Sequence, residues 1–295
     1  MIANREGRCF AAIAAAVAFA VPAAPASAEL VYALTTQNSV AVFDSADPSA
    51  ILDGGSVRNL PGSVDLEAID YRAATGEIYL LDDMENVYTF DPASFEASVV
   101  GTFSPRIPGL SFAFDFNPAF MGGQFARIIT DTNDNRVISG DTGQYLPPVE
   151  KTDVFYAAGD PNEGADPNVA GIAYTNSFGV PSSTQQYGID SRLGVLVTVA
   201  NNAGTLQTVG SLGVGPLTNE LGFDISGATG VAYAALQSGP NSMLYTIDLG
   251  TGAATLVDQI AAGDLIRSLT VIPVPEPTGF ALASLAGLGL LRRRG

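Results

Sequence analysis

The chain has 295 residues, a formal net charge of −17 and 47% hydrophobic residues. Phosphate binding needs clustered lysine and arginine, so a chain this acidic is not expected to bind nucleic acid. It has no histidine and a single cysteine, Cys9. A Ser-His-Asp triad is therefore excluded, as are a disulfide or a cysteine metal site once the N-terminus is removed.

The N-terminus has the pattern of a secretory signal peptide. Arg5 and Arg8 precede an apolar run over 10–21, and an A-x-A cleavage site ends at Ala28. The run is shorter than the roughly 20 residues that span a bilayer, so a retained anchor is the weaker alternative. We expect cleavage after Ala28, with a signal peptide at 1–28.

From residue 29 onward, short runs rich in Val, Ile, Tyr, Phe and Thr alternate with Gly, Pro, Asn and Asp, which is typical of strands and turns. Four kinds of strand recur in order. The first often ends in Asp, as at Asp70, Asp115 and Asp224. The second often follows a Thr-Gly turn, the third often ends in Asp, as in NVYTFD at 86–91, and the fourth closes the unit. Four-stranded repeats of about 40–50 residues are typical of propeller blades.

Four whole units run from 64 to about 262, and two incomplete segments remain. The N-terminal segment, 29–60, supplies a second, third and fourth strand, whereas 264–273 supplies a first strand. Together the two segments complete one more blade. We therefore predict an all-β, β-propeller-like domain at 29–273, with five four-stranded blades closed by the N- and C-terminal strands. Six blades are the alternative.

The strand pattern indicates that each blade is covered on both sides. In EIYLLD, Ile78 and Leu80 face one way while Tyr79 and Leu81 face the other. Apolar residues on both faces are expected for a sheet packed between two neighbours. We interpret the Asp at each strand end as a turn former that accepts local backbone N–H groups, rather than as a ligand.

One loop is a candidate metal site. DTNDN at 131–135 places oxygen side chains at alternate positions, on Asp131, Asn133 and Asn135, and Ca²⁺ binds ligands of this kind. The full EF-hand pattern fails, because its sixth position is Arg136 and its twelfth is Thr142. The alternative is a tight turn between two strands. We expect no other cofactor.

Catalysis without histidine would depend on carboxylates, Lys or Tyr. A glycosidase needs two carboxylates at a set separation, which a sequence does not fix. We assign no catalytic residue and expect no enzyme. The alternatives are an extracellular carbohydrate-active enzyme that uses Asp or Glu, and a Ca²⁺-dependent adhesion module.

The C-terminus reads VIPVPEPTGFALASLAGLGLLRRRG. Pro275, Glu276 and Pro277 precede a short apolar run over 279–291, and the arginines at 292–294 would stay cytoplasmic. The tail at 274–295 resembles the PEP-CTERM sorting tail of Gram-negative bacteria. That resemblance implies transient inner-membrane anchoring, cleavage near the Pro-Glu-Pro motif by an exosortase-type enzyme, and delivery to the cell surface or extracellular matrix.

The repeats themselves resemble the DUF4394 family. The resemblance rests on LVYALTTQNSVAVFD, LEAIDYRAATGEIYLL, FAFDFNP, QQYGID and LGFDI, and covers about 29–272. It implies a propeller-like repeat and no established activity. We therefore expect an exported, non-enzymatic surface or matrix protein of unknown ligand, with exopolysaccharide as a candidate partner.

Overall fold

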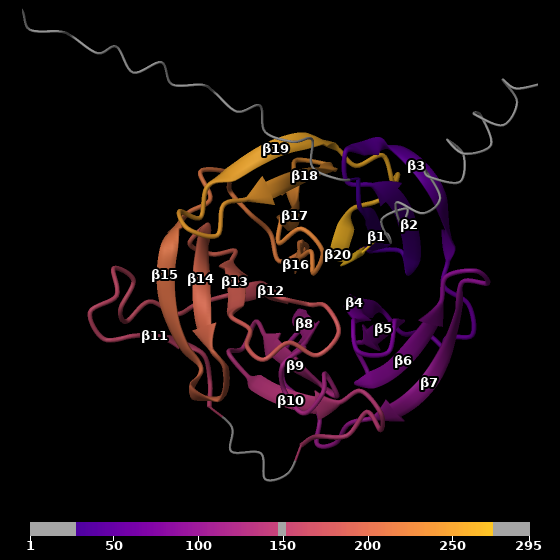
Figure 1. The fold of residues 1–295 in the computed structure, drawn as a ribbon, viewed down its shortest axis with the longest axis horizontal. Helices are drawn as coiled ribbons and strands as arrows, with labels where there is room; N and C mark the ends of the chain where they lie inside the picture. The colour runs from indigo at the N-terminus through magenta and orange to yellow at the C-terminus, as the bar shows by residue number, and fades with distance from the viewer. Residues whose placement is uncertain (1–27, 147–151, 274–295) are drawn as a thin grey trace, which may run out of the picture.

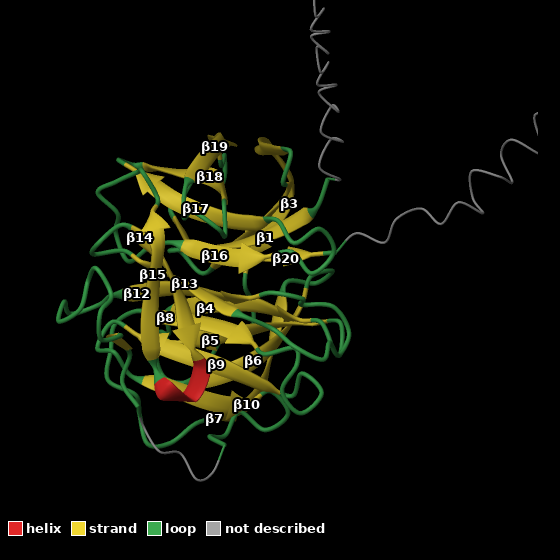
Figure 2. Ribbon diagram, turned by 60° about the vertical axis from the view of Figure 1, so that its left-hand side comes forward, coloured by secondary structure: helices red, strands yellow, loops and turns green. Residues whose placement is uncertain are grey.

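The computed structural model describes residues 28–146 and 152–273, and these residues form five small sheets arranged around a central axis (Figure 1). Strands dominate the described chain, and its single helical element is the 3₁₀ turn η1 (Asn201–Ala203) between β14 (Val195–Ala200) and β15 (Thr205–Ser211) (Figure 2). The predicted all-β, five-bladed propeller is confirmed.

We number the blades I to V around the axis and list the strands of each from the axis outward. Blade I contains β20 (Ile266–Ile272), β1 (Leu30–Thr35), β2 (Ser39–Asp44) and β3 (Asp47–Ser56). Blade II contains β4 (Leu66–Arg72), β5 (Glu77–Asp82), β6 (Asn86–Asp91) and β7 (Glu96–Thr102). Blade III contains β8 (Phe112–Phe116), β9 (Phe125–Thr130) and β10 (Asn135–Ser139). Blade IV contains β12 (Val169–Tyr174), β13 (Gln186–Asp190), β14 (Val195–Ala200), β15 (Thr205–Ser211) and β11 (Phe155–Tyr156). Blade V contains β16 (Gly222–Ile225), β17 (Ala232–Ser238), β18 (Asn241–Ile247) and β19 (Ala254–Gln259).

The ring closes through blade I, as predicted. Strand β20 from the C-terminal part of the chain pairs antiparallel with β1 from the N-terminal part, in a register that runs from Leu30 opposite Ile272 to Thr35 opposite Ile266. Closure gives both strands a partner and removes two open sheet edges.

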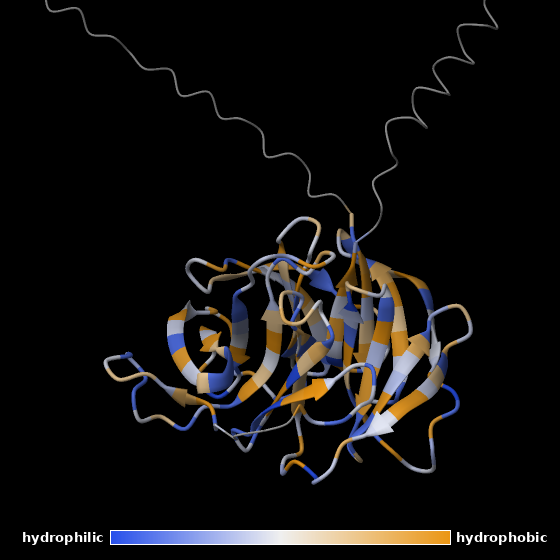
Figure 3. Ribbon diagram, turned by 60° about the horizontal axis from the view of Figure 1, so that its bottom comes forward, coloured by the Kyte–Doolittle hydropathy of each residue, from blue (hydrophilic) through white to orange (hydrophobic). Residues whose placement is uncertain are grey.

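The core consists of hydrophobic layers between successive blades. Ile78 and Leu80 pack in the cluster between blades I and II, whereas Tyr79 and Leu81 pack in the cluster between blades II and III. Three further clusters occupy the remaining blade interfaces. Hydrophobic and hydrophilic residues alternate along many of the strands (Figure 3). The predicted apolar pattern on both faces of a blade is therefore confirmed.

Blade III differs from the predicted four-stranded unit. Its described residues form three strands, and a single bridge between Ile138 and Tyr145 stands where a fourth strand would lie. Blade IV gains a short outer strand instead, because β11 runs parallel to β15. A turn after β10 leads to this bridge, and Leu146 N donates to Val137 O at 3.0 Å, so the chain lies beside β10 up to the last described residue before the gap at 147–151.

Both predicted processing segments extend beyond the described residues. Ala28, the predicted last residue of the signal peptide, is exposed at the start of the described chain. The rest of that peptide and the tail with Pro275, Glu276 and Pro277 lie outside the described part. Within 28–146 and 152–273, no helix has the length and hydrophobicity needed to cross a membrane.

Candidate functional site

Three aspartates meet on the propeller axis. Asp70 on β4, Asp115 on β8 and Asp224 on β16 occupy the same position of their first strands, and a carboxylate oxygen from each lies within 4.8 Å of the others. All three residues are buried. We call these residues the axial aspartate cluster.

The cluster exists because the first strand of each blade has one edge without a neighbouring strand. Backbone N–H groups on that edge need other acceptors. A carboxyl group on one blade accepts an N–H group from the next: Phe116 N donates to Asp70, Tyr174 N to Asp115 and Val271 N to Asp224. The bonds from Phe116 and Val271 are 2.8 and 2.6 Å long. The cluster therefore links neighbouring blades.

In the two blades without an aspartate at this position, the backbone N–H group of the next blade also has an acceptor. In blade I the position is Thr270, whose hydroxyl accepts the N–H of Tyr71 at 3.0 Å. In blade IV it is Ala173, which has no side-chain oxygen to offer. The N–H group it would have served, that of Ile225, bonds instead to the carboxylate of Asp224 at 2.6 Å. Each N–H group is thus satisfied despite the change of side chain.

Burial and proximity make these carboxyl groups weak acids. Burial raises the pKa of Asp70 well above its ordinary value, and the nearby Asp224 carboxylate raises it further. Burial likewise raises the pKa of Asp115 well above the ordinary range, with repulsion from Asp70 adding to the effect. Burial also raises the pKa of Asp224, to about 6. Carboxylates are ligands for hard cations, so the cluster could hold a divalent ion. Its oxygens, however, already accept hydrogen bonds from backbone N–H groups of neighbouring blades.

These shifts predict that stability falls as the pH rises. The cluster binds protons more tightly in the folded state than in the unfolded chain. Proton binding therefore stabilises the folded state fully below the ordinary carboxyl pKa, and this stabilisation is lost as the pH rises through the raised pKa values. We expect the free energy of unfolding to fall by roughly 1–3 kcal/mol between pH 5 and 8. Urea unfolding at several pH values measures this change.

The matched variant is Asp115→Asn, which removes one titrating group and keeps an oxygen acceptor. Its stability should depend less steeply on pH than that of the wild type. Asp70 and Asp224 still titrate in the variant, and Glu67, whose pKa burial raises to about 7, adds a slope of the same sign, so part of the pH dependence remains. Equal slopes in the variant and the wild type would contradict a role of the cluster.

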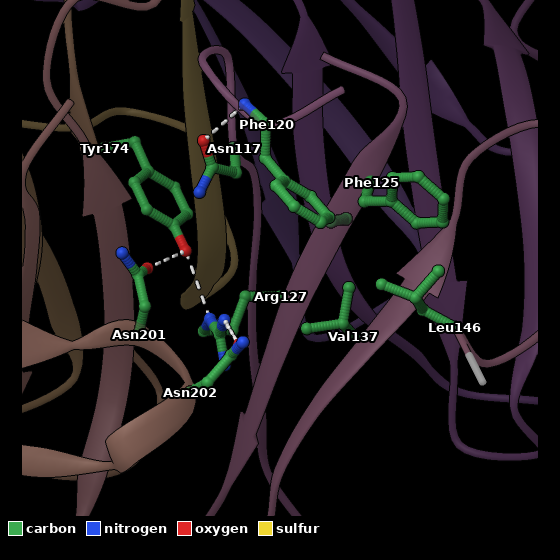
Figure 4. A pocket seen from close by; sticks show the side chains of 10 residues that line it. Asn117, Phe120, Phe125, Arg127, Val137, Leu146, Tyr174, Asn201 and Asn202 are labelled. Carbon is green, nitrogen blue, oxygen red and sulfur yellow. Dashed lines mark hydrogen bonds between the residues drawn. The ribbon is translucent and has the colours of Figure 1, made fainter. Parts of the chain in front are cut away.

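A pocket of about 140 Å³ lies between blades III and IV (Figure 4). Its described lining combines amides, aromatic rings, apolar side chains and one arginine: Asn117, Phe120, Phe125, Ala126, Arg127, Val137, Leu146, Tyr174, Asn201 and Asn202. We call it the III/IV pocket. The rings of Phe120 and Phe125 are 5.5 Å apart, and Phe120 is 39% exposed. Its volume is below the range of about 300–1,000 Å³ for drug-sized ligands, so it suits one small group.

Arg127 forms the polar wall of this pocket. It lies on β9 with 5% of its surface exposed, and within the described part of the chain its guanidinium bonds to neutral oxygens. Nε donates to the Tyr174 hydroxyl at 3.1 Å, Nη2 donates to the Asn202 amide oxygen at 2.8 Å, and Nη1 donates to Asn135. The Tyr174 hydroxyl in turn donates to Asn201 at 2.8 Å. The arginine therefore joins blades III and IV through amide and hydroxyl groups.

A family model described as "Domain of unknown function (DUF4394)" matches residues 39–270. The chain belongs to the DUF4394 family. The match begins at β2 and ends within β20, so it covers blades II to V and part of blade I. It assigns no activity to this DUF4394 domain, and no curated protein matches the chain.

Three solved structures are similar to the DUF4394 chain. "Crystal structure of Nidogen/Laminin Complex" has 11% identity and a TM-score of 0.47 over 83% of this chain and 98% of that one. "Dihydro-heme d1 dehydrogenase NirN in complex with DHE" has 11% identity and a TM-score of 0.37, with coverage of 77% and 43%. "Kuenenia stuttgartiensis Hydrazine Synthase" has 14% identity and a TM-score of 0.40, with coverage of 69% and 53%. The chain thus spans less than two thirds of the last two, and likeness at this level assigns no function.

The three predicted metal ligands have separate partners in the DUF4394 domain. Asp131 accepts the N–H of Leu110 at 2.9 Å, and the amide nitrogen of Asn133 donates to Asp166 at 2.8 Å. The Asn135 oxygen accepts from Arg127, as described above. A Ca²⁺ site at these three residues stays a prediction.

The interpretation of strand-end aspartates as turn formers is confirmed for third strands and wrong for first strands. Asp91 accepts the N–H of Ala93 at 3.0 Å, and Asp248 accepts that of Gly250 at 2.8 Å, so both form local turns. The first-strand aspartates bond across blades instead. Their repetition at one strand position was the signal for convergence, because equivalent positions of a propeller face the same axis. No comparable repetition in the sequence marked Arg127 as a site residue.

Proposed function

We propose that this DUF4394 protein is an exported, non-enzymatic component of the cell surface or extracellular matrix, and that it binds polysaccharide in the III/IV pocket. The composition of the pocket carries the proposal. Asn117, Asn201 and Asn202 offer amide donors and acceptors for hydroxyl groups, and Phe120 and Phe125 offer apolar ring surface. No carboxylate lies among its described lining residues.

Export is part of this proposal, and the two chain ends support it. The signal-peptide pattern that ends at Ala28 would direct the chain out of the cytoplasm. The PEP-CTERM-like tail with Pro275, Glu276 and Pro277 would anchor it briefly in the inner membrane of a Gram-negative bacterium. An exosortase-type enzyme would then release the propeller to the surface, where exopolysaccharide is the available partner.

A carbohydrate-active enzyme is the second candidate, because one described carboxyl group has the properties of a proton donor. Burial raises the pKa of Glu67 to about 7, which suits a general acid near neutral pH. However, Arg267 contacts Glu67 at 3.0 Å and Glu220 at 2.9 Å, so one guanidinium holds both acids in ion pairs. This arrangement favours a structural role for Glu67.

Binding and hydrolysis can be measured on the same polysaccharide. We expect the protein to bind exopolysaccharide from the producing cells without releasing reducing ends. Phe120→Ala should weaken binding about tenfold, because an aromatic contact in a pocket typically contributes 1–2 kcal/mol or more. Phe155→Ala is the matched control, since Phe155 is an exposed phenylalanine on β11 outside the pocket lining.

Two results would overturn the proposal. Equal losses for Phe120→Ala and Phe155→Ala would move the binding site away from the III/IV pocket. Release of reducing ends that disappears in Glu67→Gln would establish the enzyme instead.

A further inference from the structure

Arg127 differs from the other described arginines in its charge balance. Arg58, Arg72, Arg106, Arg136, Arg192 and Arg267 each have a carboxylate oxygen within 4.0 Å. Among the residues that the structure describes, the partners of Arg127 are the Tyr174 hydroxyl and two amide oxygens, and none of them is a carboxylate. It is also among the most buried of them, at 5% exposure. Buried charges in proteins are normally paired, because desolvation disfavours an isolated ion.

The nearest acid in the sheet does not supply the missing charge. Asp115 lies directly opposite Arg127 in the β8–β9 ladder. Its carboxyl group belongs to the axial aspartate cluster and accepts the N–H of Tyr174 there. Burial favours the neutral form of this carboxyl group, which reduces its compensation of the guanidinium further.

The guanidinium also keeps unused hydrogen-bonding capacity. An arginine has five N–H donors, and three of them are engaged by Tyr174, Asn135 and Asn202. The other two donors have no partner among the described residues, and the side chain lines the pocket. The planar fork of a guanidinium matches the two oxygens of a carboxylate.

A second buried polar group lies beside this wall. Gln186 sits opposite Tyr174 in the β12–β13 ladder, is fully buried, and has no hydrogen-bond partner for either side-chain amide atom among the residues at 28–146 and 152–273. Because residues directly opposite in a ladder project to the same face, Gln186 faces blade III as Tyr174 does. A buried amide without partners is expected to meet water or a ligand.

We propose that the III/IV pocket is specific for an acidic sugar, whose carboxylate pairs with Arg127. This inference rests on the proposed function. The amide groups of Asn117, Asn201 and Asn202 then bind hydroxyl groups of the same unit. A uronic acid residue in a polysaccharide has this chemistry. The strong negative charge of the chain opposes anions at long range, but the Debye length of about 8 Å at 0.15 M salt screens that repulsion.

The test compares glucose derivatives that carry a carboxylate, a neutral hydroxymethyl group or a sulfate ester at C6. Methyl glucuronide, methyl glucoside and glucose 6-sulfate are titrated into the exported protein at 0.15 M salt, and chemical-shift changes give each Kd. We expect methyl glucuronide to bind about 10- to 100-fold tighter than methyl glucoside, which corresponds to a hydrogen-bonded charge pair. Glucose 6-sulfate should bind less tightly than the glucuronide, because its tetrahedral head does not match the fork.

Variants locate the effect. Arg127→Gln should abolish the preference for the glucuronide, and Arg127→Lys should retain part of it, since charge remains without the fork. Arg192→Gln is the matched control, because Arg192 is an exposed arginine paired with Asp166. It should keep the full preference. Melting curves check that each variant folds. The preference of the wild-type protein for the glucuronide is measured without any variant, so it tests the inference even if a variant does not fold.

The outcomes separate this inference from the proposed function. Equal affinity for the glucuronide and the glucoside would overturn the acidic-sugar specificity and leave polysaccharide binding standing. A preference that survives in Arg127→Gln, or a tighter complex with the sulfate, would overturn the pairing of Arg127 with a carboxylate. If no sugar and no matrix polysaccharide bound, both proposals would fail.

Discussion

A chain that ends at Gly263 should be insoluble or melt at least about 10 °C below one that ends at Pro273. The shorter chain lacks β20, which places Ile266, Leu269 and Val271 in the hydrophobic layer between blades V and I. Burying a side chain of this size contributes about 1.5–3 kcal/mol, against a total stability of about 5–15 kcal/mol for a domain. Each 1 kcal/mol lost lowers the melting temperature by about 2–4 °C at this size.

The loss extends beyond apolar burial. Removing β20 opens the edge of β1 and takes away Arg267, which pairs with both Glu67 and Glu220. An open edge invites aggregation. Differential scanning calorimetry or, for an insoluble chain, the soluble fraction after expression measures the effect. Identical melting temperatures for the two chains would mean that β20 does not close the ring.

Asp224→Ala should destabilise the fold by about 2–5 kcal/mol at neutral pH. The Asp224 carboxylate accepts the N–H groups of Val271 and Ile225, both at 2.6 Å, and the hydroxyl of Thr270 at 3.0 Å. A buried donor left without an acceptor costs about 1–3 kcal/mol. Relief of repulsion with Asp70 offsets a part of this loss. Chemical denaturation at pH 7 gives the difference.

Two variants separate hydrogen bonding from charge. Asp224→Asn removes the negative charge and keeps one of the two acceptor oxygens, so its stability should lie between those of the wild type and Asp224→Ala. Asp91→Ala removes an exposed turn aspartate of the third-strand type and should cost no more than about 1 kcal/mol. If Asp224→Ala were as stable as Asp91→Ala, the cluster would not link the blades as described.

The sequence by itself determined the architecture, because the forces behind a blade are local and repeated. Period-two alternation, as in EIYLLD at 77–82, and the turn residues between strands define each strand and its two apolar faces. Repetition then gives the number of blades. The apolar run at 264–273 and the missing first strand of the N-terminal unit predicted how the ring closes, and β20 beside β1 confirms it.

Only the tertiary structure decided the sites. Asp70, Asp115 and Asp224 are distant in sequence and look like ordinary strand-end aspartates, and they meet because ring closure turns the first strand of every blade toward one axis. Arg127 likewise reads as one charged residue in a strand. Its significance depends on what surrounds it: neutral partners from blades III and IV, and no carboxylate within reach among the described residues. Strand patterns are set by neighbours along the chain, whereas charge pairing and pockets are set by neighbours in space.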